Sequence, residues 1–319
     1  MTFGRYLNLL ALALVNLLWA LQFPAYKIAS EHMGVVNLNF WTFVSALAVL
    51  LPFFWLERRR AARGALPDAS KPAARSLRGF LLLGTVGIIP PSIFLAWGIA
   101  HSTAANAAII SLIIPVLTAL MAVAMLGERM TRVRWLSFAL AIAGTVFISG
   151  LNLRGGFFHG AMLLGNAVIF IAWMGSAFYN TYSKKLLEQF SELEVLVYSY
   201  AVASLAIGGI SLGLSQRPFY DVSGYPMAAW GAIVVLGPVA WGLAMVLWMW
   251  VLKRLDVSQI SVSIYLLPLF GVLLSAVTLH ESITASELLG GGLVLIGTFL
   301  TTEWEARRMK EKPVPEPSA

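Results

Sequence analysis

The chain contains no cysteine and few charged residues. Only 12% of its 319 residues are charged, whereas soluble domains carry about 25%. Without cysteine the chain holds no disulfide and no thiolate metal site. Hydrophobic residues make up 59% of the sequence, and the mean hydropathy is +0.80. This composition excludes an ordinary soluble protein and predicts an integral membrane protein.

Sequence patterns of enzymes are also missing. The apolar segments contain no Asp or Glu pair, no Ser-x-x-Lys, no His-Glu-x-x-His and no cluster of metal ligands. We therefore expect neither an enzyme nor a bound metal or cofactor. A Walker-type Gly-Lys-Ser/Thr loop is absent, so ATP is not expected to drive the protein. Because no Asp or Glu lies in the middle of an apolar segment, function should not depend on a buried carboxylate.

Apolar segments fill almost the whole chain. A helix that crosses a bilayer needs roughly 20 mostly apolar residues. Ten segments fit this description, at residues 6–28, 35–56, 79–100, 104–126, 134–152, 159–182, 194–214, 227–252, 257–279 and 286–304. The sequence thus predicts an all-α membrane protein with ten transmembrane helices, here numbered as spans 1 to 10. The longest polar insert, residues 57–78, is expected to be a mobile loop.

Basic residues gather at one end of the predicted helices. Of the 22 Lys and Arg residues, all but Lys27, Arg154 and Arg217 fall on the same side. That side comprises residues 1–5, 57–78, 127–134, 183–193 and 253–256 and the tail after residue 304. Cytoplasmic loops are enriched in Lys and Arg, so both termini are expected in the cytoplasm. The membrane is expected to be a bacterial inner membrane. The net charge of +7 then reflects topology and lipid contact, not nucleic-acid binding.

Two stretches of the chain repeat each other without a gap. Residues 103–150 align with residues 256–303, which places five less common residues in register. The aligned pairs are Pro115 with Pro268, Glu128 with Glu281, Thr131 with Thr284, Gly144 with Gly297 and Thr145 with Thr298. If five spans separate the copies, the halves lie upside down relative to each other, as in alternating-access carriers. The predicted units are residues 1–152, residues 153–305 and a disordered tail at 306–319.

Candidate functional residues follow from the aromatic, polar and proline residues inside the spans. Aromatic density predicts a central cavity lined by spans 1, 3, 4, 6, 8 and 9, with packing as the alternative role for each ring. The candidate substrate-binding residues are Trp19, Gln22, Phe23, Trp97, Trp173, Asn180, Trp241 and Tyr265. Each proline removes a helical hydrogen bond, so Pro115 and Pro268 are predicted to be hinges. Lys27 either contacts an anionic substrate group or extends to the outer membrane interface. The Glu128 and Glu281 carboxylates are expected to stabilise hairpin turns at opposite membrane faces, with proton carriage as the alternative.

Several of these residues resemble a known family, the EamA-type transporters of the drug/metabolite transporter superfamily. The resemblance rests on Trp19-x-x-x-Phe23…Lys27, on Pro115…Leu126-Gly-Glu128-x-x-Thr131…Gly144 and on Tyr265-x-x-Pro268…Glu281-x-x-Thr284…Gly297. It implies ten helices in two inverted five-helix repeats and a secondary carrier for an amino acid or related metabolite, with export expected. Uptake of a small metabolite or vitamin-like compound and a membrane channel are the alternatives. The carrier is expected to act as a monomer on a small-molecule substrate.

Overall fold

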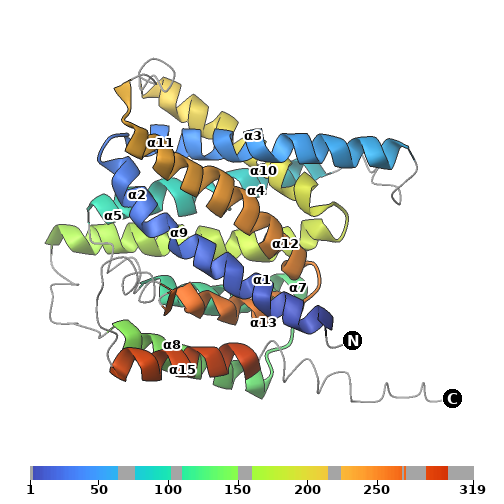
Figure 1. The fold of residues 1–319 in the computed structure, drawn as a ribbon, viewed down its shortest axis with the longest axis vertical. Helices are drawn as coiled ribbons and strands as arrows, with labels where there is room; N and C mark the ends of the chain where they lie inside the picture. The colour runs from blue at the N-terminus through green and yellow to red at the C-terminus, as the bar shows by residue number, and fades with distance from the viewer. Residues whose placement is uncertain are drawn as a thin grey trace.

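The chain folds into a bundle of helices. The computed structural model describes residues 3–63, 76–101, 110–149, 160–214, 224–267, 269–270 and 285–300. Every regular element within these ranges is helical (Figure 1). The first half holds α1 (Phe3–Ala20), α2 (Gln22–Ser30), α3 (Val35–Ala62), α4 (Leu77–Thr85), η2 (Pro90–Phe94), α5 (Leu95–Ala100), η3 (Ser111–Ile113), α7 (Ile114–Leu126) and α8 (Arg132–Ser149). The second half holds α9 (Gly160–Leu187), α10 (Glu192–Gly213), α11 (Met227–Val234), η5 (Val235–Ala244), α12 (Met245–Leu252), α13 (Val257–Ser261), η6 (Val262–Tyr265) and α15 (Ala285–Phe299).

These elements form ten helical spans, which confirms the predicted all-helical membrane architecture. Within the described ranges, six helices are long and apolar enough to cross a membrane. They cover Tyr6–Ser30, Val35–Ala62, Leu77–Gly98, Leu163–Leu187, Glu192–Gly213 and Met227–Leu252. Shorter apolar helices cover Ile114–Leu126 and Leu289–Phe299. Spans 1, 3, 4, 8 and 9 consist of two or three helical segments each, whereas α3, α9 and α10 are continuous.

One boundary differs from the sequence-based expectation. The predicted loop at residues 57–78 begins later, because α3 continues to Ala62. Its charged last turns have partners that favour the helix. The Arg58 guanidinium lies 3.2 Å from the Glu194 carboxylate, and the Arg59 guanidinium lies 3.1 Å from the centre of the Trp55 ring. Residues 64–75 lie outside the described part of the chain.

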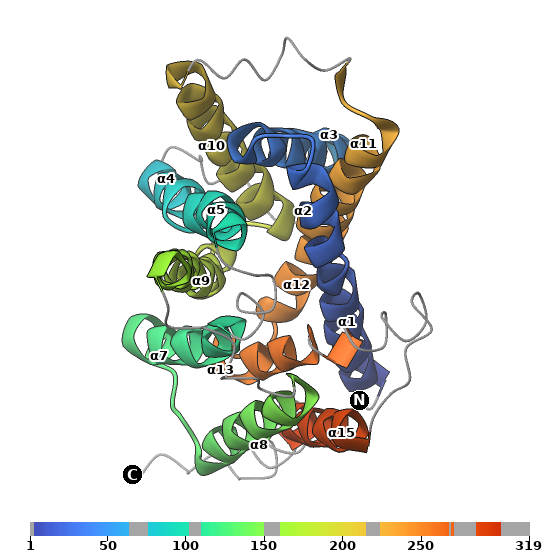
Figure 2. The same cartoon turned by 90° about the vertical axis from the view of Figure 1, so that its left-hand side faces the viewer.

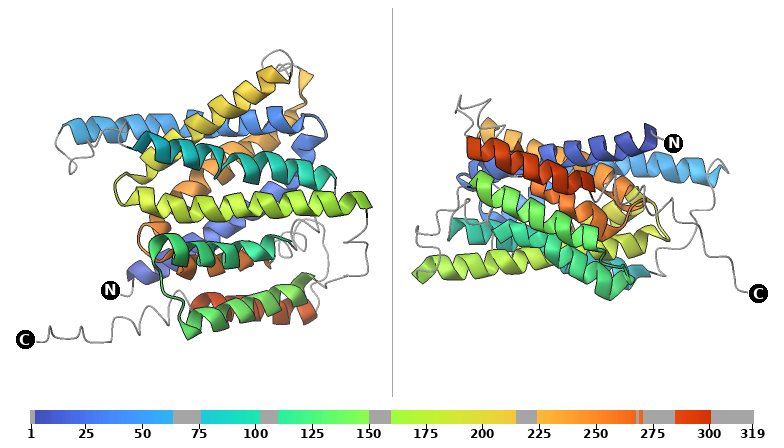
Figure 3. Two further views of the ribbon diagram at one scale, coloured as in Figure 1. Left: turned by 180° about the vertical axis from the view of Figure 1, so that it is seen from behind. Right: turned by 90° about the horizontal axis from the view of Figure 1, so that it is seen from below.

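The helices run roughly alongside one another (Figures 1 and 2), and their buried side chains form an extended apolar core. That core draws on most spans, from Leu12 in α1 to Ile264 in η6. The α8 and α15 helices lie side by side at the lower edge of the bundle in Figures 1 and 2, and they face the viewer when the bundle is seen from below (Figure 3). Spans 5 and 10 therefore form one edge of the bundle, and α3 and α10 lie at the opposite edge.

The contact between α8 and α15 uses the repeat-matched glycines. A Cβ atom added to Gly144 would lie 2.5 Å from the Gly290 carbonyl oxygen and 2.9 Å from the Val294 side chain. A Cβ atom added to Gly297 would lie 3.4 Å from Ala141. Ala141 and Val294 are themselves aligned in the repeat. Gly144 thus packs against Val294, and Gly297 packs against Ala141, the repeat partner of Val294. The higher residue number in α8 contacts the lower residue number in α15 and the reverse, so the two helices are antiparallel.

Candidate functional site

A cavity lies inside the bundle, between spans from both halves of the chain. Spans 1, 3, 4, 6, 8 and 9 contribute to its wall, the same six spans that the aromatic pattern predicts. The described lining consists of Trp19, Gln22, Gly87, Pro91, Leu95, Ser111, Ile114, Trp173, Ser176, Tyr179, Asn180, Ala240, Trp241, Met245, Ile264 and Leu267. Its volume of about 70 Å³ is several times the ~10–15 Å³ that one water needs. The walls must separate further to admit a metabolite.

Irregular helix geometry shapes this cavity. The π-helical segments η2 and η5 contain Pro90, Pro91 and Pro238 and belong to spans 3 and 8. Such wide turns leave backbone carbonyls without their usual helical partners, which a membrane tolerates only where protein or water satisfies them. Side chains from neighbouring spans supply donors for η5. The Trp19 indole N–H donates to the Ala240 carbonyl at 3.3 Å, and the Tyr200 hydroxyl donates to the Trp241 carbonyl at 2.6 Å.

Spans 4 and 9 carry a second pair of irregularities. A 3-10 segment, η3, precedes Pro115 in span 4, and the 3-10 segment η6 ends at Tyr265 in span 9. These segments correspond to each other in the sequence repeat. Pro115 is buried near the first turn of α7, so it stands at a junction between two helix types and not within a regular helix. Pro268 lies outside the described residues.

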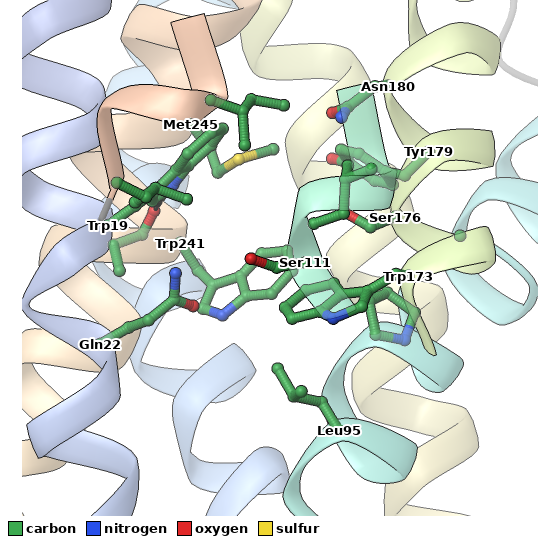
Figure 4. Close-up of a pocket in the computed structure, with 16 residues that line it drawn as sticks. Trp19, Gln22, Leu95, Ser111, Trp173, Ser176, Tyr179, Asn180, Trp241 and Met245 are labelled. Atoms are coloured by element: carbon green, nitrogen blue, oxygen red, sulfur yellow. Dashed lines mark hydrogen bonds between the residues drawn. The ribbon is translucent and has the colours of Figure 1, made fainter. Parts of the chain in front are cut away.

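Some polar groups of the cavity-lining residues have hydrogen-bond partners within the protein, and others have none. Trp19 already uses its indole N–H, whereas the indole nitrogens of Trp173 and Trp241 are buried without a hydrogen-bond partner. Asn180 is 4% exposed and lines the cavity from α9, and Gln22 lines it from α2. Figure 4 shows the Trp241 and Trp173 rings projecting toward the same space from opposite sides. None of the described lining residues carries a formal charge.

Two of the predicted residues, Tyr265 and Trp97, do not line this cavity. Tyr265 is 1% exposed and packs against Phe138 of span 5, with the ring centroids 6.5 Å apart. The 3-10 geometry of η6 turns Ile264 toward the cavity and Tyr265 away from it. Trp97 stacks on the ring of His101, at a centroid distance of 3.8 Å. Trp97 lines apolar grooves with the exposed Phe94, which is the setting of a side chain that faces lipid.

Five of the predicted residues do come together there: Trp19, Gln22, Trp173, Asn180 and Trp241. The side chains of Phe23 and Lys27 lie outside the described part of the structure. Whether any of these residues binds substrate stays a prediction.

The sequence reasoning did not identify Ser176 and Tyr179 as lining residues. Both were detectable: Ser176 lies three residues after Trp173 and four before Asn180, on their face of a regular helix, and Tyr179 lies three residues after Ser176, at the edge of that face. Ser111 and Met245 gave no comparable signal, since small polar and apolar residues recur throughout the spans.

Glu128 reaches across the bundle from the turn between spans 4 and 5. Gly127 ends α7 with a left-handed φ of 70°, a conformation that glycine adopts without strain. The next residue turns its carboxylate toward span 9. Its oxygens accept hydrogen bonds from the Val257 N–H at 2.8 Å, the Ser258 N–H at 3.0 Å and the Ser258 hydroxyl at 2.5 Å. The Glu128 carboxylate therefore stabilises the turn into span 9: it caps the first turn of α13, whose free N–H groups favour an anion. Glu281 lies outside the described residues.

Arg134 joins the same cluster from the first turn of α8. Its guanidinium donates to the Asp256 carboxylate at 2.5 Å and to the Ser258 hydroxyl at 2.6 Å. It also donates to the Arg129 carbonyl at 3.1 Å, and its side chain is 2% exposed. Asp256 precedes α13 but does not cap it, since its carboxylate turns toward Arg134. We refer to Glu128, Arg134, Asp256 and Ser258 as the charged clasp, which ties spans 4 and 5 to span 9.

Other charged side chains at this end of the bundle also connect neighbouring turns. The Lys184 ammonium donates to the Leu252 carbonyl at 2.5 Å and to the Leu255 carbonyl at 2.8 Å. This links the end of α9 to the turn between spans 8 and 9. An exposed pair, Lys253 with Glu192 at 3.4 Å, bridges the same region. The segments that carry most of the basic residues therefore lie at one end of the bundle.

Comparison with known proteins identifies the family of this chain. The EamA-like transporter family model matches twice, over residues 7–150 and 163–303. The chain belongs to the EamA-like transporter family. It is therefore a membrane transporter and not an enzyme, and the two matches indicate duplicated halves.

Relatives of this EamA-like chain include other transporters. A protein of Streptantibioticus cattleyicolor, described as a probable terminal-alkyne amino-acid exporter, is 28% identical over 305 residues and covers 96% of each chain. The uncharacterized transporter YcxC of Bacillus subtilis is 26% identical, covering 86% of this chain and 92% of its own. One solved crystal structure superposes with a TM-score of 0.73 at 21% identity, covering 96% of this chain and 100% of that one. At that identity the likeness supports the fold alone.

Proposed function

We propose that this protein is a secondary transporter that exports a small, partly apolar metabolite, an amino acid or a related compound, by alternating access. One observation carries the proposal: the cavity lies within the bundle and is lined by three spans from each half. A site between two halves can be exposed to either side when the halves move against each other. The name of the Streptantibioticus relative supports an amino acid as cargo and export as direction.

The proposed inverted repeat has structural support in the contact between spans 5 and 10. The repeat partners Gly144 and Gly297 pack reciprocally in antiparallel helices, as residues do when a two-fold axis relates them. An axis that exchanges two antiparallel transmembrane helices lies in the membrane plane. The pairing of π-helical segments in spans 3 and 8, and of 3-10 segments in spans 4 and 9, agrees with this relation. We place the boundary between the halves at residues 152–153.

The proposed topology has both termini in the cytoplasm. Three contacts bring the basic segments to one end of the bundle: Arg58 with Glu194, Lys184 with Leu255, and Arg134 with Asp256. A shared end is what the positive-inside rule requires. The charged clasp then lies on the cytoplasmic side and holds span 9 against spans 4 and 5. Opening the cavity toward the cytoplasm requires these contacts to break.

Pro115 is proposed to be the hinge for that movement in span 4. It stands where η3 meets α7, and its ring removes a backbone donor there. Span 4 can therefore bend at this junction with little further loss of hydrogen bonding. Pro268 is proposed to act in the same way in span 9, on the strength of the sequence repeat alone.

Counterflow in proteoliposomes tests the proposed function. Liposomes that contain the purified protein are loaded with an unlabelled candidate amino acid, and uptake of the labelled compound is followed. A carrier returns from the inside to the outside faster when it is loaded, so internal substrate should accelerate labelled uptake and produce a transient overshoot. A channel gives no overshoot. The absence of overshoot for every amino acid in a complete panel, with protein that is folded, would contradict the proposal.

A further inference from the structure

Two indole nitrogens among the residues that line the cavity have no hydrogen-bond partner in the structure. The indole nitrogens of Trp173 and Trp241 are both buried and unpartnered, and both residues line the cavity. Trp173 is 7% exposed. The Tyr26 hydroxyl lies close to the Trp241 indole, but not in hydrogen-bonding geometry. A buried donor without an acceptor costs free energy, so each of these groups favours a ligand that brings one.

The third tryptophan of the cavity provides an internal contrast. The indole N–H of Trp19 donates to the Ala240 carbonyl at 3.3 Å, which leaves its ring as an apolar wall. A fourth, Trp248, is fully buried beside Trp19, with the ring centroids 5.1 Å apart. Its nitrogen also lacks a partner, but Trp248 does not line the cavity. Of the three tryptophans that line the cavity, Trp173 and Trp241 therefore carry the unpartnered indole nitrogens.

We propose that Trp173 and Trp241 determine specificity by donating to acceptor oxygens of the transported molecule, and that they select a carboxylate or carbonyl over an ammonium group. This inference rests on the proposed transport function and identifies the substrate class of the same cavity. An indole N–H is a donor only, so an ammonium group gains no hydrogen bond from either nitrogen and can interact only with the ring faces. A carboxylate or carbonyl oxygen satisfies both the ligand and the buried donor.

The rest of the wall favours an apolar body on the same molecule. Leu95, Ile114, Met245 and Ile264 line the cavity together with the aromatic rings. The described lining carries no formal charge, so the site binds its ligand through neutral donors and apolar contact. The inferred substrate is therefore a compact molecule with a hydrophobic or aromatic body and an acceptor-bearing end.

A matched pair of probes tests this selection without any mutation. 3-Phenylpropionate and 2-phenylethylamine share the same body and differ in the terminal group, and 3-phenylpropionamide adds a neutral acceptor. Binding to purified wild-type protein is measured by isothermal titration calorimetry. We expect the carboxylate and the amide to bind roughly 10-fold or more tightly than the amine, as for one or two lost hydrogen bonds. Equal binding of amine and carboxylate, or no binding of either, overturns the inference.

Conservative variants identify the donors. Trp173→Phe and Trp241→Phe each remove one N–H and keep an aromatic ring, so each should weaken carboxylate binding about 10-fold while leaving amine binding within about 2-fold. Trp19→Phe and Trp248→Phe are the controls, because neither supplies a free donor to the cavity. A monodisperse elution profile in detergent verifies the fold of each variant. Equal losses in Trp173→Phe and Trp19→Phe overturn the assignment.

The two proposals fail in different ways. Binding in detergent reports recognition alone, and counterflow reports transport. Counterflow without a preference for the acceptor-bearing probe overturns the inference and leaves the transporter proposal standing. Selective binding of the carboxylate without counterflow by that probe or any amino acid supports the inference and contradicts alternating-access transport.

Discussion

The charged clasp and the cavity treat buried polar groups in opposite ways. In the clasp, the Glu128 carboxylate accepts three hydrogen bonds, and the Arg134 guanidinium, 2% exposed, donates to three acceptors. In the cavity wall, the Trp173 and Trp241 nitrogens are buried without a hydrogen-bond partner. Both regions lie at contacts between spans of different halves. The difference in hydrogen bonding therefore reflects their roles, helix contact in the clasp and ligand recognition in the cavity.

Satisfied polar groups fix one arrangement of helices, and unsatisfied ones leave capacity for a ligand. Removing one member of a buried ion pair is costly, because the remaining charge then has no partner. Removing a buried donor that had no partner is nearly neutral for folding. We infer that the clasp stabilises the state described here, while the cavity sacrifices some stability for recognition. Four predictions test this contrast, from the largest expected effect to the smallest.

Removing Arg134 should produce the largest loss of stability. Arg134→Ala leaves Glu128, whose side chain is 9% exposed, without its cationic neighbour, and Asp256, whose side chain is 46% exposed, without its partner. The expected cost is about 3 kcal/mol of unfolding free energy, the low end of the range for a buried pair, seen as a drop in the thermal midpoint in detergent. Lys253→Ala, which removes only an exposed pair with Glu192, is the control and should change little. Similar midpoints for the two variants would show that the clasp does not hold the helices together.

Removing the Ser258 hydroxyl should have an intermediate effect. Ser258→Ala deletes one donor to Glu128 and one acceptor for Arg134, at an expected cost of about 1–3 kcal/mol. Ser199→Ala is the matched control, because that buried hydroxyl donates to carbonyls of its own helix and has no charged partner among the described residues. Chemical or thermal unfolding of both variants measures the difference. A larger loss in Ser199→Ala than in Ser258→Ala would contradict the cross-span role of the clasp.

Changing the proposed hinge should alter rates and not binding. Pro115→Ala restores a backbone donor at the start of α7 and straightens the junction with η3, so exchange between states should slow several-fold. Equilibrium binding of the carboxylate probe should stay within about 2-fold, because no lining side chain is removed. Pro268→Ala is expected to behave in the same way. Transport measured at wild-type rate in both variants would reduce these prolines to packing residues.

Removing the free donor of the cavity should have the smallest effect on stability. Trp173→Phe deletes a buried N–H that has no partner, so its thermal midpoint without ligand should fall less than that of Trp19→Phe, which loses the same ring volume and a hydrogen bond as well. Binding of the carboxylate probe should fall in the same preparation. A clear loss of midpoint in Trp173→Phe without a loss of binding would make Trp173 a packing residue and remove the contrast with the clasp.

The sequence predicts the cavity well where helices are regular and poorly where they are not. Trp173 and Asn180 lie on a continuous α-helix, α9, so their depth in the membrane and the helix face that they share follow from their spacing in the sequence. Tyr265 lies in the 3-10 segment η6, which changes the rotation per residue and turns the side chain toward Phe138. Trp97 lies at the depth of the cavity in span 3, but depth along the helix does not determine which face of the helix a residue occupies.

The clasp could not be predicted because its partners are remote in sequence. Glu128 binds residues 129 and 130 positions further along the chain, and a turn motif contains no information about a neighbour across the bundle. The repeat, by contrast, was visible because Gly144 and Gly297 keep a fixed spacing. Their close packing in α8 and α15 supplies a physical reason for two glycines at those positions.

The most direct test of alternating access uses the absence of cysteine from the chain. Ser176→Cys places a single thiol in the cavity wall, and a membrane-impermeant maleimide is applied from either side of oriented vesicles. Ser204→Cys, buried away from the cavity, is the control and should not react. We predict labelling of Ser176→Cys from the side opposite the charged clasp, and a shift of labelling to the clasp side when Glu128→Gln is added. Labelling that is equally fast from both sides in the single variant, unchanged by Glu128→Gln, would indicate an open pore and contradict the account.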